Sequence, residues 1–222
     1  MKVSEVIATA RSCELSNLST SSFTDSRIIQ FINLGIIELS KRFVISTKAE
    51  KIKTSMYTSM YTLRSSDVIG ILDIYDKTGR ALVSQVLSDD ENYDYKLINN
   101  TTFLYKHKID YKATEEVNPI TGIEILQHTK EPDNELMVVY SAIADLVVNP
   151  TDEISLPLVF LDTLVAYIGY KANPAFKPAQ DGGVENVASL DKFEASCRLL
   201  ENSVYVGQTN LMSKSIQSKG FK

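Results

Sequence analysis

The segment from Thr24 to Phe43 carries a strong periodic signal that restricts it to one local structure. Five apolar residues recur there at spacings of three, four, three and four: Ile29, Ile32, Ile36, Leu39 and Phe43. This spacing places all five on one face of an α-helix. Thr24 is suited to cap the helix at its N-terminus, where the helix dipole also favours Asp25. We therefore expect a long amphipathic helix whose apolar face is covered, either by the chain's own core or by a neighbouring subunit.

Three further segments have helical character. Four apolar residues share one helical face near the start of the chain, Val3, Val6, Ile7 and Ala10, and predict a short helix that ends near Cys13. Ser155 and Pro157 are typical of the cap and first turn of a helix, which Pro174 would end. The three-four spacing returns in Leu190, Phe193, Cys197, Leu200 and Val204, with Gly207 as a C-terminal stop. The two ends of the chain are thus predicted to form a bundle of about four helices.

The middle of the chain, residues 51–150, follows a different pattern. Short runs of β-branched and aromatic residues are separated by turn residues, which predicts antiparallel strands. The expected strands are Ser55–Leu63, Val68–Tyr75, Arg80–Leu87, Thr102–Tyr111, Ile120–His128 and Leu136–Ser141. Asp76–Gly79 is expected to form a tight turn between the second and third of them. The predicted fold class is therefore α+β, with an antiparallel β domain inserted into a helical bundle.

The predicted organisation has three parts. Residues 1–50 and 151–207 form the helical bundle, residues 51–150 the inserted β domain, and residues 208–222 an extended C-terminal tail. The chain has a net charge of −5, but residues 209–222 hold three lysines and no acid, so the preceding residues carry −8. The tail also lacks periodicity, and we expect it to be unfolded alone or extended against a partner.

No catalytic or cofactor-binding pattern is present in the sequence. Of the two histidines, His107 and His128, the second follows Glu124 by four residues, a separation of about 13 Å along a strand that is too wide for one metal ion. Cys13 and Cys197 lie in predicted helices and are expected to be free thiols. No Gly-rich phosphate loop or nucleophile elbow occurs. We therefore expect no enzymatic activity, cofactor or metal site, and no segment is apolar over a length that spans a membrane.

Nucleic-acid binding is an alternative use of the β region. Tyr105–Lys112 interleaves aromatic residues with Lys106, Lys108 and Lys112, as a stacking surface for a single strand would. Tyrosines on strands more often form cross-strand packing, however. The acidic balance of the chain also argues against extensive phosphate binding. This alternative predicts binding that weakens steeply with salt and depends on the three lysines.

Two stretches resemble head-to-tail adaptor proteins of tailed bacteriophages. The helix that opens many of these adaptors shows an aromatic residue, a small polar cap, Asp, two apolar residues, and then Asn and Gly ahead of Glu-Leu. The corresponding residues here are Phe23, Thr24, Asp25, Ile28, Ile29, Asn33, Gly35, Glu38 and Leu39. The later stretch is also similar to these adaptors, and it consists of Glu135–Ala142, a Pro-containing gap, and Ile154–Pro157 opening a helix with Ala166 and Tyr167.

The resemblance implies a structural virion protein without catalytic activity. Such adaptors look like a small helical bundle with an inserted β region, and they form a ring, usually of twelve copies, below the portal protein. They contact further tail or neck proteins, and double-stranded DNA passes through the lumen without specific binding. The protein would be assembled in the bacterial cytoplasm and found in the neck of the virion. A different tail or neck completion protein is the alternative within this class.

The resemblance also assigns a role to the C-terminal tail. In such adaptors this segment often extends away from the body and clamps the portal. The residues expected to contact the portal here are Leu211, Met212, Lys214, Ile216, Lys219, Phe221 and Lys222. The acidic body suits a DNA conduit, because net repulsion lets DNA slide without sticking.

Overall fold

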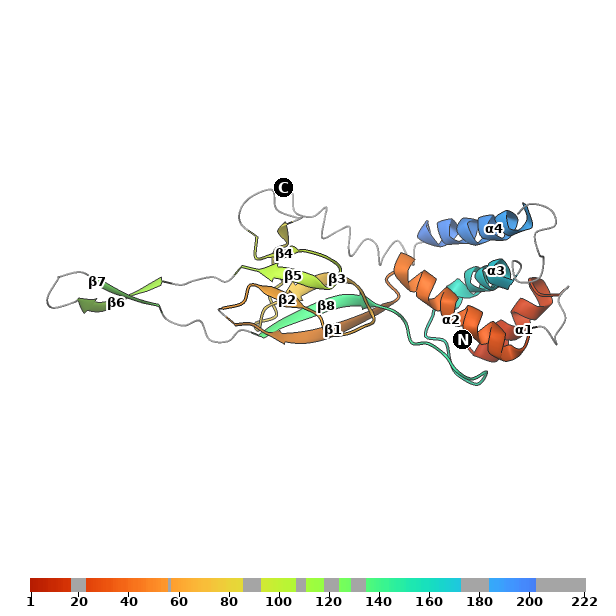
Figure 1. Cartoon of the computed structure of the whole chain (residues 1–222), viewed down its shortest axis with the longest axis horizontal. Coiled ribbons are helices and arrows are strands. Elements are labelled where there is room, and N and C mark those ends of the chain that lie inside the picture. The colour runs from red at the N-terminus through yellow and green to blue at the C-terminus, as the bar shows by residue number, and fades with distance from the viewer. Residues whose placement is uncertain are drawn as a thin grey trace. The chain divides into compact units, whose positions relative to one another are not determined.

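The computed structural model describes residues 1–16, 23–55, 57–85, 93–106, 111–117, 124–128, 135–172 and 184–202. Within these residues the chain is α+β, as predicted, with four α-helices and antiparallel sheets (Figure 1). It divides into two compact units. The helical unit comprises the residues before Thr47 and after Ser141, and the β unit is Thr47–Ser141. The two divisions, after Ser46 and after Ser141, fall before the predicted boundaries at 50 and 150.

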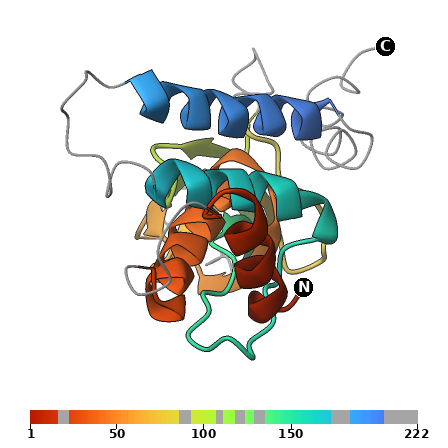
Figure 2. The ribbon, with the colours of Figure 1, turned by 90° about the vertical axis from the view of Figure 1, so that its right-hand side faces the viewer.

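The helical unit is built around one central helix. Its elements are α1 (Val3–Cys13), α2 (Asp25–Arg42), the 3₁₀ turn η2 (Leu158–Phe160), α3 (Leu161–Ala172) and α4 (Val184–Glu201). Figure 2 shows α3 between α4 on one side and α1 and α2 on the other. Consistent with this position, eight of the twelve residues of α3 are buried. None of the described helices is long and apolar enough to cross a membrane.

The long helix α2 forms as its sequence predicts. Thr24 is the N-cap, and its hydroxyl accepts a hydrogen bond from the backbone N–H of Arg27 at 3.4 Å. All five residues of the periodic stripe are buried among the other helices of this unit. The stripe therefore closes the chain's own core, and it is not available to a neighbouring subunit.

Two helix boundaries differ from prediction. Ser155 does not cap a helix, because Pro157 instead precedes the η2 turn and the α-helix begins at Leu161. The turn buries Phe160 and exposes Leu158, which was expected on the buried face. α4 ends at Glu201, and Asn202, a weak helix former, follows it in a turn. Val204 and Gly207 lie outside the described residues.

The β unit contains two three-stranded sheets and one hairpin. The first sheet has the order β1 (Ser46–Lys53), β8 (Glu135–Ala142), β3 (Val68–Tyr75), and the second has the order β2 (Met60–Thr62), β5 (Thr102–Tyr105), β4 (Tyr95–Leu97). The hairpin joins β6 (Tyr111–Val117) to β7 (Glu124–His128), with a register irregularity between Ala113 and Val117. Aromatic side chains dominate the core of the second sheet, where Phe103 contacts the rings of Tyr61 and Tyr95.

Prediction of the individual strands had mixed success. β3 matches its predicted range, and β8 extends its range by one residue at each end. The predicted strand Arg80–Leu87 is wrong for its described part, which forms only single bridges at Ala81 and Ser84. A side chain replaces the strand partner here, because the carboxylate of Asp94 accepts the backbone N–H of Val83 at 3.0 Å. The strands β1 and β4 were not predicted, nor was β6 beyond its first residue, Tyr111.

Candidate assembly surfaces

Asn33 joins α2 to a segment far away in the sequence. Its side-chain Nδ2 donates to the carbonyl oxygen of Val147 at 2.8 Å, and the backbone N–H of Val147 donates to its Oδ1 at 2.9 Å. Further along the helix, the buried hydroxyl of Ser40 accepts the backbone N–H of Ala144 at 3.2 Å. Two polar residues of α2 thus replace a strand partner for the segment that follows β8.

Gly35 allows α2 to lie close to α3. A Cβ atom at this position would stand 2.5 Å from Cδ1 of Leu164 and 3.1 Å from Cδ1 of Tyr167. The Tyr167 ring is buried and packs edge-on against Phe193 of α4, with centroids 5.0 Å apart. Burial raises the pKa of Tyr167 to about 12. A side chain at residue 35 would force the Leu164 and Tyr167 side chains to shift, which accounts for a glycine within the helix.

Arg42 connects the end of α2 to α4. Its guanidinium lies 2.7 Å from each carboxylate oxygen of Glu194 and 3.0 Å from Oε1 of Glu38, and it stacks 5.0 Å from the ring centroid of Phe193. The bond from Arg42 holds the pKa of Glu194 below its usual range. Beside this cluster, burial raises the pKa of Cys197 to about 11, which favours the protonated thiol at neutral pH.

The residues of α2 that carry the phage-adaptor resemblance therefore have structural roles. They cap the helix, fix the segment after β8 and allow close approach of α3, and Glu38 pairs with Arg42, which itself anchors α4. The resemblance in this stretch therefore reflects how α2 packs in the helical unit.

The segment from Ile143 to Pro157, here called the anchored loop, exposes apolar side chains while its backbone is held. Leu146 is 51% exposed and Val148 76% exposed. The carboxylate of Asp152 accepts the backbone N–H groups of Val148 and Asn149, each at 2.8 Å, and these bonds lower the pKa of Asp152. Because the loop is fixed, its exposed apolar groups are presented in one arrangement.

Exposed apolar side chains continue on either side of the anchored loop. Leu158 and Val159 of the η2 turn are 69% and 44% exposed, and Leu34 of α2, next to Asn33, is 45% exposed. Single exposed apolar residues need no explanation, but several of them on fixed backbone mark a surface suited to protein contacts. The anchored loop is therefore the candidate assembly surface of the helical unit.

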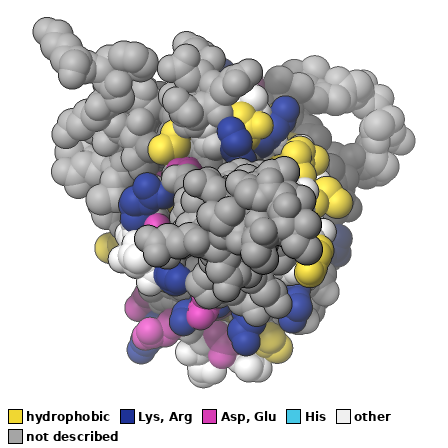
Figure 3. Space-filling model, turned by 90° about the vertical axis from the view of Figure 1, so that its left-hand side faces the viewer, with side chains coloured by type: hydrophobic (Ala, Val, Ile, Leu, Met, Phe, Trp, Pro, Cys, Tyr) yellow, Lys and Arg dark blue, Asp and Glu magenta, His cyan; other side chains and the backbone are white. Residues whose placement is uncertain are grey.

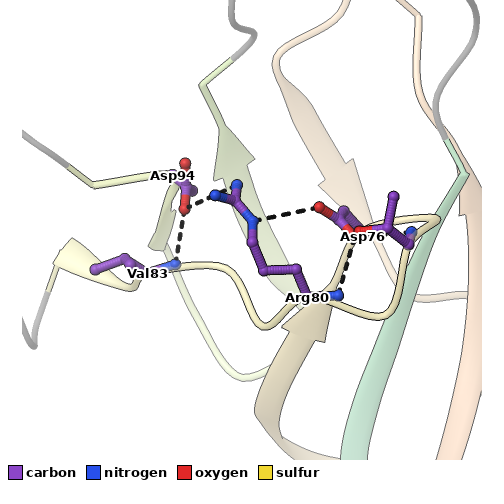
Figure 4. A network of polar contacts seen from close by, with 5 residues as sticks. Asp76, Arg80, Val83 and Asp94 are labelled. Atoms are coloured by element: carbon purple, nitrogen blue, oxygen red, sulfur yellow. Dashed lines mark hydrogen bonds and ion pairs between the residues drawn. The ribbon is translucent and has the colours of Figure 1, made fainter.

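A polar network in the β unit fixes the turn after β3 (Figure 4). The Asp76 carboxylate accepts the backbone N–H groups of Thr78 at 2.8 Å and Arg80 at 3.0 Å, and it pairs with the Arg80 guanidinium. The bond from the Thr78 hydroxyl contributes most to lowering the pKa of Asp76 to about 2. Gly79 has φ +82°, as a tight turn of this kind requires, so the predicted turn is confirmed.

A groove between two outer strands forms the second candidate surface. It has a volume of about 430 Å³ and is lined by residues of β1, β2 and the segment after β2: Glu50, Lys51, Ile52, Lys53, Met60, Tyr61, Thr62 and Arg64. Three of these residues are cations and one is an acid, in a chain whose overall charge is negative. Elsewhere too, exposed Lys and Arg side chains lie beside hydrophobic ones on the face seen in Figure 3. We call this feature the edge groove.

The remaining predicted site residues fall in several places. The seven tail residues expected to contact the portal, Leu211 to Lys222, lie outside the described residues, as do His107 and Lys108. Tyr105 is only 8% exposed, so its ring packs inside the β unit. Cys13 and Cys197 are free thiols, as expected. In the part of the chain that the structure describes, no group of His, Cys, Asp and Glu side chains is arranged to hold a metal ion.

No protein-family model matches the chain, and no curated protein matches it either.

Proposed function

We propose that the chain is a head-to-tail adaptor of a tailed bacteriophage. In this role it forms a ring, usually of twelve copies, below the portal, and it contacts further tail or neck proteins. Double-stranded DNA passes through the lumen without specific binding, and the protein resides in the neck of the virion. It acts as a structural component and needs no cofactor or catalytic residue.

The observation that supports this proposal best is the contact of Gly35 with Tyr167. The two residues come from the two separate stretches that resemble phage adaptors. A Cβ added at Gly35 would lie only 2.5 Å from Leu164 and 3.1 Å from Tyr167, both on α3. Stretches that resemble one family and also depend on each other for packing favour a shared fold over a chance likeness of two helices. The α+β architecture with a β region inserted between helices is also the one that the resemblance implies.

Within this proposal, the anchored loop makes the contact between neighbouring copies. A closed ring needs two different, complementary surfaces on each subunit. The buried stripe of α2 is excluded from this role, whereas Leu146 and Val148 are exposed on a fixed backbone. The C-terminal tail, residues 208–222, is assigned to the portal.

The test is to mix the purified chain with portal rings of the same virus and image the products by electron microscopy. We expect an added ring below the portal. A chain lacking residues 208–222 should keep its circular-dichroism spectrum but fail to dock, whereas a chain with the same tail residues in scrambled order serves as the length and charge control. Val148→Asp should prevent ring closure, and Tyr57→Asp, at a position of the β unit that is also largely exposed, should not.

The possible outcomes separate the parts of the proposal. A ring that joins the virion away from the portal would replace the adaptor with another neck or tail completion protein. Normal docking of the truncated chain would exclude the tail as the portal contact. Absence of any ring with portals or tail components would reject the virion role altogether.

A further inference from the structure

The edge groove lies between two strands that each lack a neighbour on one side. β1 is the outer strand of the sheet β1-β8-β3, and β2 is the outer strand of the sheet β2-β5-β4. Among the described residues, no strand covers the free side of either one. The outer edge of a strand presents backbone N–H and C=O groups that can pair with another extended chain.

Side chains hold the two outer strands at the ends of the groove. The carboxylate of Glu50 on β1 accepts the backbone N–H of Arg64 at 3.2 Å, and the Tyr61 hydroxyl accepts the backbone N–H of Ser55 at 2.9 Å. In a continuous sheet, backbone carbonyl groups would accept these N–H groups. Here the Glu50 carboxylate and the Tyr61 hydroxyl accept them instead. The groove is therefore a fixed gap between two sheets of the β unit.

The charge of the groove indicates what kind of chain would fit. Lys51 and Lys53 are two residues apart on β1, so their side chains leave the same face of the strand, and both are exposed. The intervening Ile52 points to the other face of the strand, and both it and Met60 of β2, which is 57% exposed, line the groove. A matching strand would place acids at alternate positions and apolar residues between them.

The sheet already contains one pair of this type. The Lys51 ammonium lies 2.9 Å from the carboxylate of Glu135 on β8, the neighbour of β1 on its paired side. Lysines on an outer strand also discourage pairing with an apolar strand. In such a pair, each lysine ammonium would face an apolar side chain that cannot compensate its charge. The same lysines therefore select against self-association and in favour of an acidic partner.

We propose that the edge groove binds an extended acidic segment of a partner protein, with alternating acidic and apolar residues, as an added β-strand. The binding would combine backbone hydrogen bonds along an outer strand with ion pairs to Lys51, Lys53 and Arg64. This inference goes beyond the proposed ring function and does not depend on it, since it involves only the β unit.

The first experiment measures binding of a fluorescein-labelled peptide of five Glu-Val repeats to the full chain by fluorescence anisotropy. We expect saturable binding that Lys51→Glu combined with Lys53→Glu weakens about tenfold or more, because opposite-charge cross-strand pairs become like-charge pairs. The matched control, Lys77→Glu combined with Lys96→Glu, makes the same charge change at exposed positions outside the groove lining and should leave binding within twofold. Circular dichroism confirms that both variants fold.

The second experiment separates strand addition from charge attraction alone. Two further versions of the same peptide are made, each N-methylated on every second backbone amide. In one version the odd-numbered amides are methylated, and in the other the even-numbered ones, which gives the two possible phases. One phase blocks the amides that face the outer strand and should abolish binding, whereas the other leaves them free and should bind like the parent. Equal binding of both phases would overturn the proposal, as would equal binding of a Lys-Val peptide or no binding of the Glu-Val peptide. A single-stranded oligonucleotide that displaces the peptide would instead assign the groove to nucleic acid.

Discussion

The helical unit and the β unit bury their side chains in different ways. In the helical unit, one continuous core joins α1, α2, α3 and α4, and it includes the largest fully buried aliphatic residues of α2. The β unit divides its strands among small sheets, leaves the outer sides of β1 and β2 without strand neighbours among the described residues, and fixes its turns with polar networks. The difference suggests that the helical unit provides most of the stabilising core, while each unit offers one candidate contact surface: the anchored loop in the helical unit and the edge groove in the β unit.

The largest expected effect tests whether stability is concentrated in the helical core. Ile36→Ala removes a side chain that is fully buried between helices, and we expect a loss of about 2–5 kcal/mol in the free energy of unfolding. Ile98→Ala, at a 49% exposed position of the β unit, should change it by less than about 0.5 kcal/mol. Urea unfolding followed by far-UV circular dichroism measures both, and similar losses in the two variants would contradict the comparison.

A smaller effect is expected where polar groups join distant segments. Asn33→Ala leaves the backbone N–H and C=O of Val147 without their partner and should cost about 1–3 kcal/mol. Asn99→Ala is the matched change in the β unit, where the side chain accepts only the local N–H and hydroxyl of Thr101, and it should cost less. Limited proteolysis should also cut the anchored loop faster in Asn33→Ala. Unchanged cleavage there would mean that Asn33 does not fix the loop.

The smallest expected effect concerns the turn at Asp76. Hydrogen bonds from Thr78 and Arg80 lower its pKa in the folded protein to about 2, from an ordinary value of 3.8. Because the folded pKa is the lower one, the carboxylate stabilises the turn above about pH 4, and this contribution is lost as the pH falls toward 2. At the surface it should amount to less than about 1 kcal/mol. Asp76→Asn should lower the melting temperature slightly at pH 6 but not at pH 2, and an equal shift at both would contradict this assignment.

The sequence predicted those parts of the fold that depend on local periodicity and capping. α2 is the clearest case, since Thr24 and the stripe from Ile29 to Phe43 act within a single helix. The role of Asn33 was not predictable, because its partner Val147 lies 114 residues away and offers only backbone atoms. Only the structure shows that Asn33 holds the anchored loop, which is the candidate assembly surface of the helical unit.

The errors in the β unit have equally specific causes. β1 was missed because the sequence Ser46–Lys53 is mostly charged or polar, a composition that suits an outer strand and hides the alternation of a buried one. The predicted strand after Gly79 has β-forming residues, but Asp94 satisfies the backbone N–H of Val83 instead of a neighbouring strand. The edge groove was missed for the same reason as β1, since its lysines appear in the sequence as an ordinary solvated run.

The two strands that connect the units have a consequence for how this protein can vary. The chain leaves the helical unit through β1 and returns through β8, and these strands are neighbours in one sheet. Paired strands lie about 4.8 Å apart, so the helices are joined as though by a short hairpin, whatever length of chain lies between. Because the entropy of closing a loop grows slowly with its length, insertions and deletions beyond these strands leave the helical packing nearly unaffected. A methyl group added at Gly35, by contrast, acts directly on that packing, because Leu164 and Tyr167 of α3 would have to shift to make room for it.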